Sequence, residues 1–195
     1  MNKKLLTLAV AVAALSLPGQ ANSQEILTGD TRLACEAVLC LASGTRPSEC
    51  TPSLSRYFSI TARTLSNTIR KRRNFLKLCP TSNQTPEMAS LISAQVNGAG
   101  RCDARSLNVS LVMWRSSWDG GERYISNRMP DYCAVYTGHA YTDFESSGTM
   151  PRYVGTQENG GFWAEAKDYE RALAEYNTRL EVERQRNRNN SWLQR

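Results

Sequence analysis

Six cysteines constrain the fold of this chain more than any other sequence feature. They all follow an N-terminal stretch typical of a secretory signal peptide, with Lys3 and Lys4, an apolar run at 5–17 and small residues near Ala21 and Ser23. An oxidising compartment leaves few thiols free, so an even number of cysteines in an exported chain indicates disulfides. We therefore expect residues 1–23 to be a cleaved signal peptide. We expect three disulfides among Cys35, Cys40, Cys50, Cys79, Cys102 and Cys133.

The cysteine spacing favours neither a metal site nor a catalytic thiol. Structural zinc sites are commonly built from closely spaced Cys and His, and this sequence has no C-x-x-C pair. A cysteine nucleophile needs a base to form its thiolate, and His139, the only histidine, lies in another part of the chain. We expect no metal and no cofactor.

Six cysteines allow fifteen pairings. Cys35 and Cys40 lie in one apolar helical stretch, about 140° apart around the helix axis, so they cannot bond each other without breaking the helix. Each of them must reach a different element. We prefer a pattern that keeps the four N-terminal cysteines among themselves and joins Cys102 to Cys133.

Hydrophobic periodicity predicts a mainly helical chain. A first helix is capped by Asp30 and ends at Gly44. A long helical pattern of apolar residues covers 52–79, and a turn near 59–64 could interrupt it. A third helix covers 86–96. Alternation predicts a strand at 107–114, and the residues Tyr, Val and Thr predict one or two more at 132–144. A loop at 145–161 precedes a last helix at 162–183.

The predicted fold class is therefore α+β and mainly α-helical. A disulfide-braced helical N-terminal half is followed by a small antiparallel β element and a long C-terminal helix. We expect one domain at 24–183 and a flexible basic tail at 184–195. The last helix has an apolar seam with a coiled-coil spacing, so it either packs on its own domain or mediates self-association through 162–180. The seam consists of Phe162, Ala166, Tyr169, Leu173, Tyr176 and Leu180.

Positive charge is modest overall but concentrated in one segment. Without Lys3 and Lys4 the chain has 22 basic and 18 acidic side chains, a net charge of +4. The segment TIRKRRNFLK and its flank predict a basic ridge of Arg63, Arg70, Arg73 and Lys77. Such a ridge is either a solvated face or a contact surface for an acidic protein, phosphates or the acidic surfaces of the cell envelope. Nucleic acid is not expected, because only Phe75 is nearby for base stacking.

An enzyme needs an acid, a base or a nucleophile in a pocket. Glu36 is acidic within an apolar helix, so burial could raise its pKa and make it a general acid; an ion pair with Arg32 or Arg46 is the alternative. His139 has no Ser or Asp partner at a recognisable spacing. The sequence contains no P-loop, GxGxxG, GxSxG or HExxH motif. We therefore assign no catalytic residue.

The stretch ILTGDTRLACEAVLCLASGTRPSECTPSLSRYFSI, with NFLKLCP after it, resembles the TrbM/KikA/MpfK family of conjugal transfer proteins. The short segments PDYC, YTDF, PRYVG and GGFW also fit this family, so the resemblance covers most of the chain. It implies a small exported protein of plasmid mating-pair formation and type IV secretion, in the periplasm of a Gram-negative donor. It supplies no catalytic motif that can be placed on residues of this chain.

Two classes of function follow. The first is a periplasmic accessory or assembly factor of conjugative transfer, which acts by binding protein components of the transfer apparatus. The second is a periplasmic hydrolase or lytic enzyme that acts on peptidoglycan and assists insertion of the channel. The absence of a second placed carboxylate or of a catalytic triad favours the first.

Export is the first testable prediction. Mass spectrometry of the periplasmic fraction should find a mature N-terminus near Asn22 or Gln24, because the basic and apolar parts of a signal peptide precede these residues. A mature protein that retains Met1 would contradict it.

Overall fold

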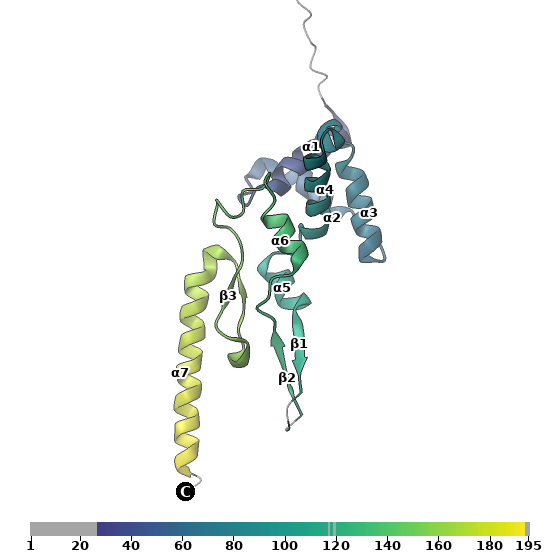
Figure 1. The fold of residues 1–195 in the computed structure, drawn as a ribbon. Coiled ribbons are helices and arrows are strands. Elements are labelled where there is room, and N and C mark those ends of the chain that lie inside the picture. Colours follow the sequence, from purple (N-terminus) through teal and green to yellow (C-terminus); the bar gives the residue numbers. More distant parts are fainter. Residues whose placement is uncertain (1–26, 117, 119, 194–195) are drawn as a thin grey trace, which may run out of the picture.

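The computed structural model describes residues 27–116, 118 and 120–193 (Figure 1). The signal peptide expected at 1–23 lies outside these residues. The helices are α1 (Gly29–Ala42), α2 (Thr51–Ser59), α3 (Leu65–Leu76), α4 (Pro86–Gly98), α5 (Ala104–Ser110), α6 (Asp131–Thr137) and α7 (Tyr169–Leu193). Strands β1 (Val112–Arg115) and β2 (Glu122–Ile125) form one antiparallel pair, and β3 (Arg152–Val154) and β4 (Phe162–Ala164) form another. This agrees with the predicted fold class.

The molecule is elongated, with helices at one end (Figure 1). Helices α1 to α4 cluster there, α5 and α6 follow, and the β1–β2 hairpin points away from them. The long helix α7 runs in the same direction as the hairpin and contacts β3. The N-terminal helices α1 to α4 thus form one end of the molecule, and β3 and α7 lie together in another part of it.

Helix α1 is the centre of the helical region. Ala34, Ala37, Val38 and Leu41 are almost fully buried on it, and α2, α3 and α4 all contact it. Alanine side chains let neighbouring helices approach closely. The buried Gln95 of α4 donates from Nε2 to the Val38 carbonyl at 2.7 Å, which ties α4 to α1.

Asp30 does not cap this helix, contrary to the prediction. The helix begins at Gly29, after Thr28, and no side chain caps it. The Asp30 carboxylate instead accepts two hydrogen bonds from Arg56 on α2, at 3.0 and 2.7 Å. These bonds lower the pKa of Asp30, so the residue joins two helices rather than ending one.

Three disulfides pair all six cysteines. Cys35–Cys79 joins α1 to the chain just beyond α3, and Cys40–Cys50 joins α1 to the start of α2. Cys102–Cys133 joins the α4–α5 turn to α6 and is the pairing preferred from sequence. Cys35 and Cys40 reach different elements, as helix geometry required.

The strand predicted at 107–114 is mostly helix. Asp103 accepts a hydrogen bond from the Ser106 N–H and so starts α5, and only Val112–Arg115 is a strand. Leu107 is buried while Val109 is exposed, so the apolar alternation does not follow burial. The residues that face the core, Ala104 and Leu107, are three apart, which is a helical spacing.

The strands predicted at 132–144 are wrong. The segment forms α6 and then turns, with Cys133, Tyr136 and Thr137 buried at helical steps of three and four. Tyr, Val and Thr favour strands, but contacts with α4 and the disulfide at Cys133 decide the local structure. Gly98 of α4 allows this contact, because a Cβ there would lie 2.4 Å from the Tyr136 ring.

The last helix begins at Tyr169 rather than at 162. Phe162 belongs to β4, and its partner β3 lies in the segment predicted to be a loop. Val154 and Ala164 form a small core with Ala172 and Tyr176, and Leu173 and Leu180 pack against it. The apolar seam therefore packs at least in part within the chain, with Leu173 and Leu180 partly buried, and self-association through this helix stays a prediction. The helix continues to Leu193, through most of the segment expected to be a flexible tail.

Removal of individual disulfides should lower the free energy of unfolding by unequal amounts. Replacing Cys35 and Cys79 with Ala should lower the free energy of unfolding by about 4 kcal/mol, against about 2.7 kcal/mol for Cys40 and Cys50, because the first loop is longer. The sequence separations are 44 and 10. Urea unfolding of the two double variants measures the difference, and alkylation of the parent without reductant should label no cysteine. Equal or reversed costs would contradict the loop-length argument.

Candidate functional site

The basic ridge lies on and around α3, which is at the outer side of the helical region (Figure 1). Arg70 and Arg73 belong to the helix, whereas Arg63 precedes it and Lys77 follows its last residue. Arg63, Arg70 and Lys77 are exposed, and Arg73 is half-buried. The Arg70 guanidinium donates to Asn67 Oδ1 at 3.1 Å. None of the four forms an ion pair with another residue of the described chain. The ridge therefore presents uncompensated positive charge.

Arg72, a neighbour of the ridge, turns inward and has a structural role. Its guanidinium donates to the carbonyls of Ile60 and Phe58 at 3.2 and 3.4 Å, at the end of α2. It also lies over the ring of Tyr57, 4.9 Å from the centroid. Sequence reasoning overlooked this residue, although its three- and four-residue spacing from Ile69 and Leu76 places it on the buried side of α3.

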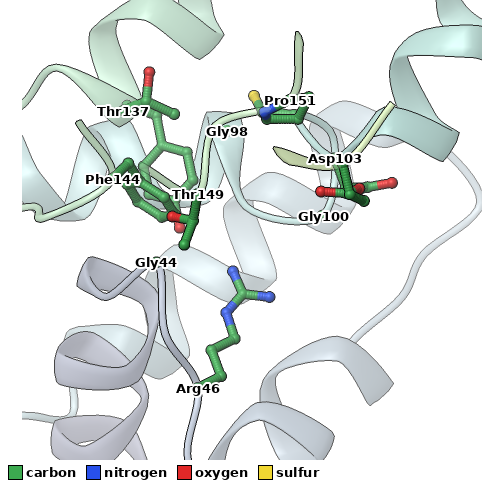
Figure 2. Close-up of a pocket in the computed structure, with 12 residues that line it drawn as sticks. Gly44, Arg46, Gly98, Gly100, Asp103, Thr137, Phe144, Thr149 and Pro151 are labelled. Atoms are coloured by element: carbon green, nitrogen blue, oxygen red, sulfur yellow. The ribbon is translucent and has the colours of Figure 1, made fainter. Parts of the chain in front are cut away.

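A central pocket lies where the segment after α1, the turn between α4 and α5, and α6 meet the segment before β3 (Figure 2). It has a volume of about 190 Å³ and opens into a wider hollow of about 680 Å³ that shares most of its polar lining. Figure 2 shows Arg46 extending from the segment after α1 into this space, with Thr149 on one side and Asp103 on the other. Glu165 also lines both parts. The pocket thus combines one guanidinium with two carboxylates.

Both carboxylates are already used by the fold. Asp103 Oδ1 accepts from the Ser106 N–H at 2.9 Å, and Oδ2 accepts from the Ser106 hydroxyl at 2.8 Å. Glu165 Oε1 accepts from the Ala104 N–H at 2.8 Å. They satisfy the free N–H groups at the start of α5, which is a structural function.

The wall of the pocket also holds the C-terminal end of α1. The Tyr136 hydroxyl donates to the Leu41 carbonyl, and the Asp143 N–H donates to the Ala42 carbonyl at 3.1 Å. The Asp143 carboxylate accepts from the Ser43 hydroxyl at 3.0 Å and from the Gly44 N–H. Burial raises the pKa of Tyr136, and the nearby Arg46 guanidinium opposes part of this rise. Tyr136 therefore remains a neutral donor at physiological pH.

The two residues considered for catalysis are not brought together. Glu36 lies on α1, partly exposed, with its Oε1 3.6 Å from Nη1 of Arg32, the ion pair considered from the sequence. His139 lies in the turn after α6, where Nε2 is 3.3 Å from the Ser90 hydroxyl and Nδ1 accepts from the Tyr141 N–H. Across the described ranges, no group of three or more His, Cys, Asp or Glu side chains is placed to hold a metal ion.

A comparison with protein families identifies the family to which the chain belongs. The TrbM family model matches residues 26–177. The chain belongs to the TrbM family. TrbM membership implies a protein related to conjugative transfer, in agreement with the resemblance of the cysteine block. No curated protein and no solved structure matches the chain.

The short TrbM-like segments of the C-terminal half make long-range contacts. In YTDF, Asp143 holds the end of α1. In PRYVG, the Tyr153 hydroxyl donates to the Ile125 carbonyl at 2.7 Å, and Gly155 leaves room for Tyr176, since a Cβ there would be 2.1 Å from its ring. In GGFW, Trp163 donates from Nε1 to the Ser126 carbonyl at 3.0 Å. These segments therefore tie β3 and β4 to the end of the β1–β2 hairpin and the turn after α6 to the end of α1.

Loss of the Tyr136 hydroxyl should destabilise the protein. Tyr136→Phe keeps the ring but removes the donor to a buried carbonyl, so we expect the free energy of unfolding to fall by about 1–3 kcal/mol. Tyr141→Phe is the matched control, because Tyr141 is exposed, and it should change stability by less than about 0.5 kcal/mol. Denaturant unfolding measures both. A Tyr136→Phe protein as stable as the parent would show that the α1 end does not need this contact.

Proposed function

We propose that this TrbM-family protein is an exported periplasmic accessory or assembly factor of plasmid conjugative transfer. In this proposal it supports mating-pair formation and type IV secretion by binding protein components of the apparatus. The uncompensated positive charge around α3 is the observation that carries the proposal. Between Glu49 and Glu87 the sequence has seven basic side chains and no acidic one, and Arg56 alone among the seven pairs with a described carboxylate, that of Asp30. Such a field attracts acidic partner surfaces and speeds their association.

The covalent structure supports an exported location. Three disulfides are consistent with a protein that folds outside the reducing cytoplasm, and the N-terminal sequence has the pattern of a signal peptide. Over the part of the chain that the structure describes, no helix is both long enough and apolar enough for a membrane span.

A peptidoglycan-acting hydrolase is the alternative. It would require a general acid and a second carboxylate on either side of a glycosidic bond. Asp103 and Glu165 line one pocket, but both accept hydrogen bonds from the first turn of α5. Glu36, the acid considered from sequence, pairs with Arg32 on the surface of α1. These contacts favour structural roles for the carboxylates and therefore an interaction function.

Removal of the ridge charge should reduce transfer without unfolding the protein. Replacing Arg63, Arg70, Arg73 and Lys77 with Gln should leave the melting temperature nearly unchanged, because three of these charges are exposed and none of the four forms an ion pair with a described residue. The same variant should lower mating efficiency by about tenfold or more if the ridge contains an interaction hot spot. Mating assays in a donor that lacks the chromosomal or plasmid copy measure this loss.

A second variant controls for net charge. It replaces the same number of exposed arginines away from the ridge, namely Arg123, Arg184, Arg186 and Arg188. The control should support normal transfer. Equal loss in both variants would mean that total charge matters and not the ridge, and normal transfer in the ridge variant would make the ridge a solvated face.

The alternative function has its own test. Asp103→Asn, Glu165→Gln, Glu36→Gln and His139→Asn should each support transfer within a few-fold of the parent when the variant is folded, because none of them supplies a catalytic proton in this proposal. Purified parent protein should release no fragments from peptidoglycan. Glycan cleavage by the parent that one folded variant abolishes would replace the interaction function with the enzyme.

A further inference from the structure

A groove lies beside the basic ridge, between the start of α3, α5 and α6. Its volume is about 380 Å³, and its main lining residues are Leu65, Arg101, Arg105, Val109 and Tyr132. We refer to these five residues as the α5–α6 groove. Leu65 and Val109 are 53% and 73% exposed and come from two different helices. Apolar side chains that meet in an exposed hollow, rather than scattered singly, are typical of a contact site.

The charge of the groove is one-sided. Arg101 and Arg105 both line it, and its lining contains no Asp or Glu. Among the described residues neither arginine has an ion-pair partner. Arginine forms two parallel hydrogen bonds with a carboxylate, so these guanidinium groups favour an acidic ligand over a neutral one.

The groove is held in shape before any partner binds. The Arg101 guanidinium stacks on the Tyr132 ring, 3.8 Å from its centroid, and Nη1 donates to the Asn97 carbonyl at 2.7 Å. Arg101 directly precedes Cys102 and Tyr132 directly precedes Cys133, so the Cys102–Cys133 disulfide joins the two walls of the groove. A fixed site loses little conformational freedom on binding, which increases affinity.

We propose that the α5–α6 groove binds a short acidic and apolar segment of a protein of the same transfer system. One aliphatic or aromatic side chain of this segment fills the space between Leu65 and Val109. Its carboxylates pair with Arg105 and with the free edge of Arg101. The inference deepens the proposed interaction function and rests on it, with the ridge providing long-range attraction and the groove providing the anchoring contact.

The geometry favours a protein segment over a nucleic acid. The face of Tyr132 that Arg101 covers is not free to stack on a base, and aromatic stacking is a main source of affinity for single-stranded nucleic acids. A volume of about 380 Å³ is near the lower end of the roughly 300–1,000 Å³ range of ligand pockets, which suits one or two side chains.

Site-specific photo-crosslinking in donor cells tests the proposal. A benzophenone amino acid replaces Val109 in the full chain, in cells that carry the complete transfer system, and mass spectrometry maps the adduct. We expect an adduct with an Asp/Glu-rich segment of another protein of that system. The same amino acid at Leu39, which is 72% exposed on α1, is the control and should not give this adduct.

Charge variants identify the contact. In the photo-crosslinking chain, Arg105→Glu should reduce the adduct by about tenfold or more, as expected for an anchoring residue, whereas Arg105→Lys, which keeps the charge but loses the two parallel hydrogen bonds, should reduce it less. Leu65→Ser, a second variant that leaves the charge unchanged, should also reduce it. Each variant is first checked for an unchanged melting temperature.

Several outcomes would overturn the inference. These are the absence of an adduct at Val109, an adduct with a second copy of this chain, an adduct with lipid or with a segment that lacks acidic residues, and an adduct unaffected by Arg105→Glu. A different result would contradict the proposed function itself. If deletion of the gene leaves transfer normal, the proposed function is wrong, whereas if only the groove variants behave like the parent, the groove inference alone is wrong.

Discussion

Burial of α1 is the constraint on which the rest of this structure depends. Its small and apolar side chains form the centre of the helical region, and two of the three disulfides begin on it. The carbonyls at its C-terminal end accept hydrogen bonds from Tyr136 and Asp143, about a hundred residues later in the chain. The C-terminal end of the first helix is therefore held by segments about a hundred residues later in the chain.

The N-terminal half could be predicted from sequence because its signals are local. The helix starts expected at 52 and 86 match those of α2 and α4 within one residue, and helix geometry excluded a Cys35–Cys40 bond. The errors lie where a few tertiary contacts override local preference. Residues 132–137 have the composition of a strand, but Tyr136 and Cys133 need helical spacing to reach α1 and Cys102 together. Phe162 fits the periodicity of the last helix, yet its pairing with Val154 makes it a strand residue.

The candidate sites likewise divide into features that local sequence predicts and features that depend on tertiary contacts. A segment with many basic residues and no acidic one predicts a charged surface without any knowledge of the fold, and three of the four ridge residues are indeed exposed. The inward turn of Arg72, next to the half-buried Arg73, depends on which side of α3 meets α2. The central pocket and the α5–α6 groove combine residues from several segments, and no spacing in the sequence brings Leu65 close to Val109.

If the α5–α6 groove binds a partner as proposed, the Cys102–Cys133 bond links that recognition to thiol oxidation. Before it forms, Arg101 and Tyr132 belong to segments about thirty residues apart, and only the stacking of a guanidinium on a ring and the surrounding helix contacts hold them together. A newly synthesised chain in the reducing cytosol therefore lacks a rigid groove. On the proposed route of export, oxidation comes first and recognition second. Under the proposed function, a partner present on both sides of the inner membrane would be bound tightly only on the outer side, and the disulfide would set the order in which oxidation and binding occur.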